Sequence, residues 1–195
     1  MLARSFVKSK LPTHIAIIMD GNRRWAKRNK LSKRLGHYEG AKNLTKIIEE
    51  CINLSIKYLT VYAFSTENWH REENEVEGLL KLLNDFLNDK EEIFLKKEIK
   101  LNILGDISKF PEEIQKKISR LLLNTNKYNN ITLNIALNYS SRDEIIQAIN
   151  NIIKDNKSEI NKEIFAKYLY TASIPDPDLI IRTSGEYRLS NFLLW

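Results

Sequence analysis

Hydrophobic residues occur along this chain in two kinds of pattern, short continuous runs and longer stretches with helical spacing. Three continuous runs, rich in β-branched and aromatic residues, span residues 15–19, 58–64 and 179–181. Runs of this kind are typical of parallel strands that are covered on both faces. Residues 99–104 and 131–137 alternate apolar and polar positions more clearly. They predict two further strands, which lie nearer a sheet edge or face a wetter surface.

Four other stretches carry apolar residues at the spacing of one helical face. These stripes span residues 44–52, 76–87, 114–122 and 145–153. We expect all four to pack in the core, and the helix of the second stripe is also a candidate wall for a ligand channel. Strand-like and helix-like stretches alternate, and no repeat or linker interrupts them. The sequence therefore predicts a single α/β domain with a mainly parallel central sheet flanked by helices.

The composition is that of an ordinary folded protein, with 43% hydrophobic and 29% charged residues in a chain of 195. No apolar run approaches the roughly 18 residues that span a bilayer, and the first residues lack the apolar core of a signal peptide. The single cysteine, Cys51, excludes an internal disulfide and a CxxC site and fits a reducing compartment. We therefore expect a cytoplasmic protein in which Cys51 is a buried filler.

A formal net charge of +6 predicts an anionic partner, and the arginines indicate which kind. Seven of the ten arginines lie in or just beyond the segments that follow the predicted strands, whereas the lysines are scattered. These segments lie at the carboxyl ends of the strands, which is where ligands bind in parallel sheets. Because a guanidinium matches phosphate oxygens two at a time, the pattern predicts a discrete phosphate pocket. A nucleic-acid binder would show a basic stripe or a reader motif; we find neither and expect no nucleic-acid partner.

The usual phosphate-binding motifs are missing, since the chain has no GxxxxGK[ST], GxGxxG or DDxxD. A bound diphosphate would depend on arginines, on backbone N–H groups at helix starts and on an ion held by one carboxylate. Asp20 is the obvious carboxylate, because it ends a buried strand and Gly21 behind it lets a ligand approach the backbone closely. The structural alternative for Asp20 is a turn or N-cap residue.

The segment 65–71 and His37 are further candidates, each with a structural alternative. Four polar residues of the segment are expected opposite Asp20 at the same sheet edge. An asparagine such as Asn68 is common in turns, however, and Trp69 could simply cap the core. We expect His37 to open the first helix, where the helix N-terminus favours a neutral imidazole or a phosphate contact. A lone histidine is more often structural.

Six segments together resemble the cis-prenyltransferase family, and within it most closely the bacterial undecaprenyl diphosphate synthases. They are HIAIIMDGNRRWA, GHYEGA, YAFSTENWHR, ILGD, ALNYSSRDEI and DPDLIIRTSGEYRLSNFLLW, which occur in the family's order from one end of the chain to the other. The resemblance implies a mostly parallel α/β fold and a homodimer. It also implies a transferase that extends an allylic diphosphate, such as farnesyl diphosphate, by cis additions of isopentenyl diphosphate with Mg²⁺.

The implied product is a long polyprenyl diphosphate of the undecaprenyl type, a carrier lipid for cell-wall synthesis, which would bring the protein into peripheral contact with the inner face of the membrane. Two alternatives stay open, a short-product cis-prenyltransferase and a non-catalytic binding subunit of the same family. The presence of Asp20, Asn68 and the C-terminal arginines favours the enzyme.

The resemblance also implies a role for individual residues. Asp20 would hold Mg²⁺ and position diphosphate, and Asn68 would take part in proton transfer. The residues implied to bind substrate are Gly21, Asn22, Arg23, Arg24, Trp25, Lys33, His37, Ser65, Thr66, Glu67, Trp69, Arg71, Arg182, Arg188, Leu189 and Ser190.

The chain departs from the family pattern at three places. Lys33 stands where an arginine is usual, and Tyr187 stands where many bacterial members have a Mg²⁺-binding histidine. The family pattern also continues beyond Trp195, so we expect this chain to be one domain, residues 1–195, that lacks its C-terminal portion. Ser190 is expected to cap a helix that begins in the last five residues.

Overall fold

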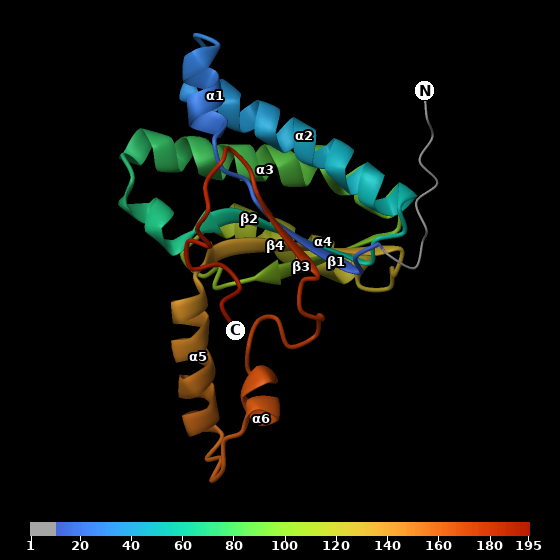
Figure 1. Ribbon diagram of the computed structural model, residues 1–195, viewed down its shortest axis with the longest axis vertical. Coiled ribbons are helices and arrows are strands. Elements are labelled where there is room, and N and C mark those ends of the chain that lie inside the picture. Colours follow the sequence, from blue (N-terminus) through green and yellow to red (C-terminus); the bar gives the residue numbers. More distant parts are fainter. Residues whose placement is uncertain (1–10) are drawn as a thin grey trace.

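The computed structural model describes residues 11–195, which form one five-stranded sheet with helices on its faces (Figure 1). The strands are β1 (His14–Ile18), β2 (Tyr58–Ser65), β3 (Ile99–Leu104), β4 (Ile131–Tyr139) and β5 (Leu179–Arg182). All neighbouring pairs are parallel, and the order across the sheet is β3-β4-β2-β1-β5. The predicted α/β fold with a parallel central sheet is confirmed.

The helices are α1 (Asn22–Arg28), α2 (Lys33–Asn53), the short 3₁₀ helix η2 (Thr66–His70), α3 (Glu73–Lys96), α4 (Glu112–Thr125), α5 (Ser141–Lys154) and α6 (Lys162–Ala166). In Figure 1, α2 and α3 run along one face of the sheet, and α5 and α6 extend away on the other side. The four predicted apolar stripes lie in α2, α3, α4 and α5, whereas α1 and α6 were not predicted.

Two apolar clusters cover the two faces of the sheet. The larger one joins the strands to α2, α3 and α4, through side chains such as Leu44, Leu87 and Ile118. The smaller one, on the opposite face, packs Phe192 and Tyr139 with residues of the chain that follows α6. Cys51 is buried in the larger cluster, as expected. One face is thus closed by long helices and the other by irregular chain from the C-terminal third.

Two strands differ from the sequence-based expectation of their place in the sheet. β3 is an edge strand as predicted, but β4 lies between β3 and β2 and is buried along most of its length. Its polar Asn134 is fully buried because it donates to Thr60 and accepts from Asn102 on the two neighbouring strands. β5 is the opposite edge strand, so its apolar run is not covered: Leu179 is 44% exposed.

The expected core role is also wrong for part of α5, and the expected C-terminal helix is absent. Ile146 and Ile153 of α5 are 58% and 64% exposed, because the helix packs through Ala148 and Ile152 instead. Residues 190–195 form no helix, and Ser190 has a positive φ of 49° rather than N-cap geometry. Phe192 of this segment lies buried against the sheet.

Candidate active site

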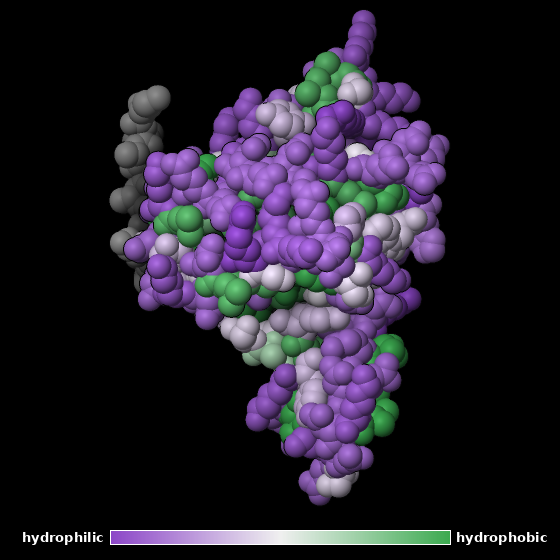
Figure 2. Space-filling view, turned by 180° about the vertical axis from the view of Figure 1, so that it is seen from behind, coloured by the Kyte–Doolittle hydropathy of each residue, from purple (hydrophilic) through white to green (hydrophobic). Residues whose placement is uncertain are grey.

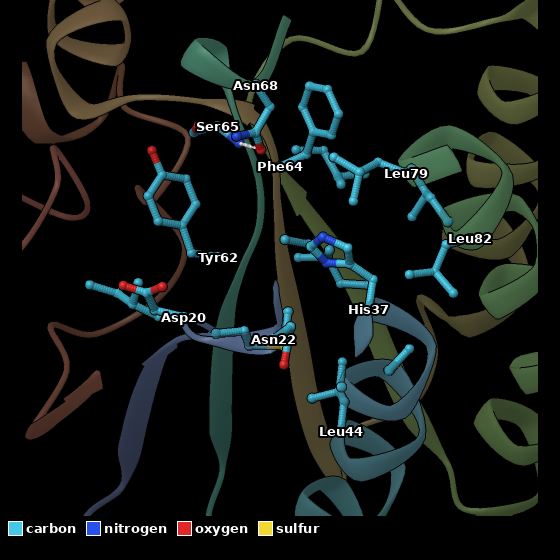
Figure 3. A pocket seen from close by; sticks show the side chains of 18 of the residues that line it. Asp20, Asn22, His37, Leu44, Tyr62, Phe64, Ser65, Asn68, Leu79 and Leu82 are labelled. Atoms are coloured by element: carbon cyan, nitrogen blue, oxygen red, sulfur yellow. Dashed lines mark hydrogen bonds between the residues drawn. The ribbon is translucent and has the colours of Figure 1, made fainter. Parts of the chain in front are cut away.

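Two adjoining cavities open at the carboxyl ends of the strands, where the sequence placed the site. The first has a volume of about 450 Å³ and combines a polar mouth with an apolar body built by α2 and α3. Figure 3 shows Asp20 and Tyr62 at the sheet, His37 and Leu44 projecting from α2, and Leu79 and Leu82 from α3. Its polar lining includes Asp20, Asn22, His37, Ser65, Glu67, Asn68, Arg71, Arg182, Arg188 and Ser190.

The second cavity, of about 660 Å³, shares Asp20, His37 and Arg71 with the first and adds a group of basic residues. Of the residues implied to bind substrate, it adds Gly21, Arg23, Arg24 and Lys33. Trp25, Thr66, Trp69 and Leu189 line neither cavity. The fold therefore brings most of the predicted residues together from segments up to 170 positions apart in a chain of 195.

Asp20 lies between two arginines at the end of β1. Its Oδ2 accepts hydrogen bonds from Arg182 Nη2 at 2.8 Å and Nε at 3.2 Å, and its Oδ1 lies 3.4 Å from Arg24 Nη2. Partial burial opposes ionisation of Asp20. The hydrogen bonds from Arg182 and from the Gly21 N–H outweigh it, so the pKa of Asp20 lies below its ordinary value. Asp20 is therefore a carboxylate at neutral pH.

Gly21 is required by the geometry of this turn. Its φ is +92°, and a Cβ at this position would lie 2.5 Å from Cβ of Ser184. Both the backbone conformation and the close approach exclude a side chain. The chain can turn here from β1 into α1, whose first residues face the second cavity.

A carboxylate that sequence reasoning missed, Glu186, connects α1 to the loop after β5. It accepts from Arg24 Nη1 at 2.7 Å and from Arg188. Arg182 in turn donates to the Arg188 carbonyl and to Ser190 Oγ, both at 2.6 Å. Three of the arginines at the cavity mouth are thus held in place by protein acceptors before any ligand binds.

A second missed carboxylate, Glu75 in the first turn of α3, gathers the remaining cations. It pairs with Arg71 at 2.5 Å, with Arg23 at 3.3 Å and with Lys33 at 3.5 Å. Burial opposes its ionisation, but Arg71 and the other cations outweigh it and lower the pKa of Glu75. The signal in the sequence was Arg71 four residues before Glu75, the spacing of neighbours on a helical turn.

His37 lies in the second turn of α2 rather than at its start, because the helix begins at Lys33 with Ser32 as its N-cap. Burial of the ring, followed by the charge of Arg71, lowers the pKa of His37, so the imidazole is neutral at pH 7. Within residues 11–195, its buried Nε2 has no hydrogen-bond partner. An unpartnered nitrogen on the cavity wall is suited to contact a polar ligand group.

The carboxamide oxygen of Asn68 is already used in a hydrogen bond within the protein. Its Oδ1 accepts the Ser65 backbone N–H at 3.0 Å in a capping box that starts η2 (Figure 3). Because a backbone N–H can only donate, the oxygen assignment is fixed by this bond. Asn68 lines the first cavity, and its Nδ2 donors are the atoms that it can offer a ligand without sharing the oxygen already used by Ser65.

A sequence model of the family described as putative undecaprenyl diphosphate synthase matches residues 18–195. The chain belongs to this family, the cis-prenyltransferases. The expected family membership and the expected enzyme class, a prenyltransferase, are both confirmed.

Two related sequences match nearly the whole chain. An isoprenyl transferase of Fusobacterium nucleatum is 51% identical over 97% of this chain and 82% of its own length. A ditrans,polycis-undecaprenyl-diphosphate synthase of Micrococcus luteus, named as specific for (2E,6E)-farnesyl diphosphate, is 47% identical over 96% of this chain and 78% of its own.

Solved structures agree with the fold. Lavandulyl diphosphate synthase of Lavandula x intermedia, in complex with dimethylallyl diphosphate, aligns with a TM-score of 0.89 at 35% identity, over 94% of this chain and 82% of that one. A probable undecaprenyl diphosphate synthase of Campylobacter jejuni aligns with a TM-score of 0.79 at 34% identity, over 94% and 80%. Across the described part of this cis-prenyltransferase, no helix has the length and apolarity to cross a bilayer.

The residues present fit a Mg²⁺ ion that is shared with a substrate. Residues 11–195 contain no group of three or more His, Cys, Asp or Glu that could hold a metal alone. Asp20 offers a single ionised carboxylate beside a basic cavity. Mg²⁺ is commonly bound in this way, through one or two carboxylates, substrate phosphates and water.

Proposed function

We propose that this cis-prenyltransferase condenses isopentenyl diphosphate with farnesyl diphosphate in cis and makes a long polyprenyl diphosphate of the undecaprenyl type. One observation carries the proposal: a polar mouth with several arginines opens directly into an apolar body lined by α2 and α3. A diphosphate attached to a growing hydrocarbon tail has this division of polar and apolar surface. The names of the Micrococcus luteus and Campylobacter jejuni proteins support the product class.

The allylic diphosphate is proposed to bind at the start of α1. Asn22, Arg23 and Arg24 line the second cavity there. Ionisation of the substrate leaves a highly charged diphosphate, so fixed positive charge at the leaving oxygens is the main source of catalysis. Mg²⁺ held by Asp20 would add Lewis-acid stabilisation of the same oxygens.

Isopentenyl diphosphate is proposed to bind opposite, at Arg182, Arg188 and Ser190. Arg182 already contacts Asp20 on one side and Ser190 on the other, so it lies between the two diphosphate positions. Holding both substrates in register turns the condensation into an intramolecular step, which lowers its entropic cost.

Asn68 is proposed to hold a substrate oxygen through Nδ2, while the departing proton goes to diphosphate or to water. Its carboxamide oxygen is occupied by the Ser65 N–H, and an amide is a poor base in any case. This revises the proton-transfer role that the family resemblance implied for Asn68.

A homodimer is part of the proposal and is supported by exposed apolar side chains. Ile146 and Ile153 on α5 and Leu179 and Ile181 on the edge strand β5 are each more than a third exposed. Figure 2 shows apolar residues on the arm of the molecule where Figure 1 places α5 and α6. Exposed apolar patches and uncovered edge strands are typical of protein interfaces.

The proposed setting is the cytoplasm, with peripheral contact at the inner face of the membrane. The support is chemical: the product would have a long hydrocarbon tail and a charged head, and such a molecule partitions into a bilayer.

Incubation of the purified chain with farnesyl diphosphate, labelled isopentenyl diphosphate and Mg²⁺ tests the function. We expect a butanol-extractable product whose dephosphorylated chain runs as a long polyprenol on thin-layer chromatography. A product of only a few isoprene units would establish a short-chain enzyme instead. No product from a folded protein that binds both diphosphates would establish a binding subunit.

A further inference from the structure

Asn138 connects η2 to the loop after β3, although it lines neither cavity itself. It lies near the end of β4 and is 8% exposed. Its Oδ1 accepts the indole N–H of Trp69, in η2 after β2, at 2.8 Å. Its Nδ2 donates to the carbonyl of Asp106, in the loop after β3, at 2.8 Å. Both halves of the carboxamide are therefore used, each by a different loop.

The backbone of Asn138 is shaped for this position. Its φ is +46°, in the left-handed region that asparagine tolerates better than most residues. A regular strand would send the side chain of residue 138 to the face that buries Asn134 and Ala136. The left-handed turn instead places the carboxamide between Trp69 and Asp106. Backbone conformations of this kind cluster at functional sites.

Trp69 is held on its other sides by aromatic rings. Its centroid lies 4.8 Å from that of Phe64 and 5.5 Å from that of Phe110, both in edge-to-face geometry. The indole thus points into the core, with its single polar atom satisfied by Asn138. A buried indole N–H that loses its acceptor is costly, so this hydrogen bond fixes the orientation of the ring.

The orientation of Trp69 determines where its neighbours lie. Glu67 and Asn68 precede it and Arg71 follows it, and all three line the first cavity. η2 has only five residues, so it cannot hold its own position without tertiary contacts. The core-facing indole holds the turn from one side, and the substrate-facing groups project from the other.

We propose that Asn138 is a positioning residue for the condensation, which acts by fixing Trp69 and thereby the turn that presents Asn68 to the substrates. Trp69, which the family resemblance implied to bind substrate, has the same positioning role. The turnover predictions rest on the proposed function; the structural predictions for Trp69 do not.

Asn138→Gly is the variant of choice, because glycine accepts the positive φ and the side chain is removed without backbone strain. Asn134→Ala is the matched control. It removes a second buried carboxamide of β4 that also makes two side-chain hydrogen bonds, with Thr60 and Asn102, at a distance from η2. Both variants are expected to lower the unfolding midpoint.

We expect Asn138→Gly to lower kcat at least ten-fold and Asn134→Ala to leave kcat within about two-fold of wild type. Trp69→Phe is expected to lower kcat similarly and to add little in the Asn138→Gly background, because the two residues act through one contact. Asn138→Asp keeps an acceptor for the indole and is expected to recover part of the activity. Wild-type kcat in Asn138→Gly, equal losses in both asparagine variants, or additive effects with Trp69→Phe would overturn the proposal.

A readout that does not require turnover separates this proposal from the proposed function. In ¹⁵N-labelled protein, the Trp69 indole resonance, assigned through Trp69→Phe, should shift and lose protection from hydrogen exchange in Asn138→Gly but not in Asn134→Ala. If wild type makes no polyprenyl product and the resonance behaves in this way, only the proposed function fails. If the resonance is unchanged in Asn138→Gly, the positioning role fails whatever the activity.

Discussion

The orientation of Asn68 makes a prediction that separates a hydrogen-bond donor from a base. Asn68→Asp keeps an oxygen that can accept the Ser65 N–H, removes the Nδ2 donors and adds a negative charge that could act as a base. A donor role predicts a large loss of activity, whereas a base role predicts equal or higher activity, since a carboxylate is a much stronger base than an amide. The two hypotheses therefore predict opposite changes in activity for the same substitution.

The expected size of the effect follows from the contacts. A hydrogen bond to a charged group is worth about 1.5–3 kcal/mol. Its loss alone lowers kcat/KM by about ten- to 150-fold, since about 1.4 kcal/mol corresponds to a factor of ten. Repulsion between the new carboxylate and a bound diphosphate acts in the same direction, so the lower figure is a minimum.

Stability provides the internal control. Asn68→Ala removes the capping box and is expected to cost about 1 kcal/mol of unfolding free energy, or about 2–4 °C in Tm for a chain of this size. Asn68→Asp keeps the cap and should unfold close to wild type. The assay is initial-rate incorporation of labelled isopentenyl diphosphate at several concentrations of both substrates, beside thermal melts. Wild-type or higher kcat/KM in Asn68→Asp would refute the donor role, and a melt as low as that of Asn68→Ala would refute the capping geometry.

Further predictions concern the charged groups and the exposed apolar surface. Asp20→Ala should abolish turnover and leave the circular dichroism spectrum unchanged, because the lost group is a strand-end carboxylate outside the core; activity near wild type would contradict the metal role. The native pKa of Glu75 lies below its ordinary value of 4.5, so its ion pairs stabilise the fold above that pH and are lost as the pH falls through the native pKa. Urea unfolding between pH 6 and 3 should show a steeper loss of stability in wild type than in Glu75→Gln, and parallel profiles would count against the prediction. Ile153→Asp should convert a dimer to a monomer in light scattering, and an unchanged mass would remove α5 from the proposed interface.

The fold could be predicted because a continuous apolar run indicates a buried strand and an apolar stripe indicates a helix packed on one side. Both patterns can be recognised from neighbouring residues alone. The exceptions depend on neighbours that are distant in sequence. Asn134 can be buried in β4 only because Thr60 and Asn102 meet it across two strand pairs. The run in β5 is exposed because that strand is last in the sheet, a property of strand order and not of the run. The exposed isoleucines of α5 could not be predicted from its apolar stripe. The helix has more isoleucines than its one buried side can cover, and the sequence does not show which of them are buried.

Most of the candidate site could be predicted for a related reason. Parallel strands bring their carboxyl ends to one edge, so Asp20 and Arg182 meet across 162 positions once β1 and β5 are neighbours. What could not be predicted were the acceptors that hold the cations. Glu75 resembles any acidic residue in a first helical turn, and Glu186 resembles any acidic residue in a loop; only the folded chain brings two arginines to each.

These acceptors resolve a physical difficulty of the site. Several cations must lie together to bind diphosphates, yet their mutual repulsion destabilises an empty site. Glu75, Glu186 and Asp20 place a counter-charge beside each of the five arginines that line the cavities, so the cluster can exist before substrate arrives. Arginine suits this arrangement because its planar group offers five N–H donors and can hold a protein oxygen with some while others face the cavity. The carboxylates thus act as built-in counter-ions, and the positive charge that a departing diphosphate needs is already oriented when the substrate binds.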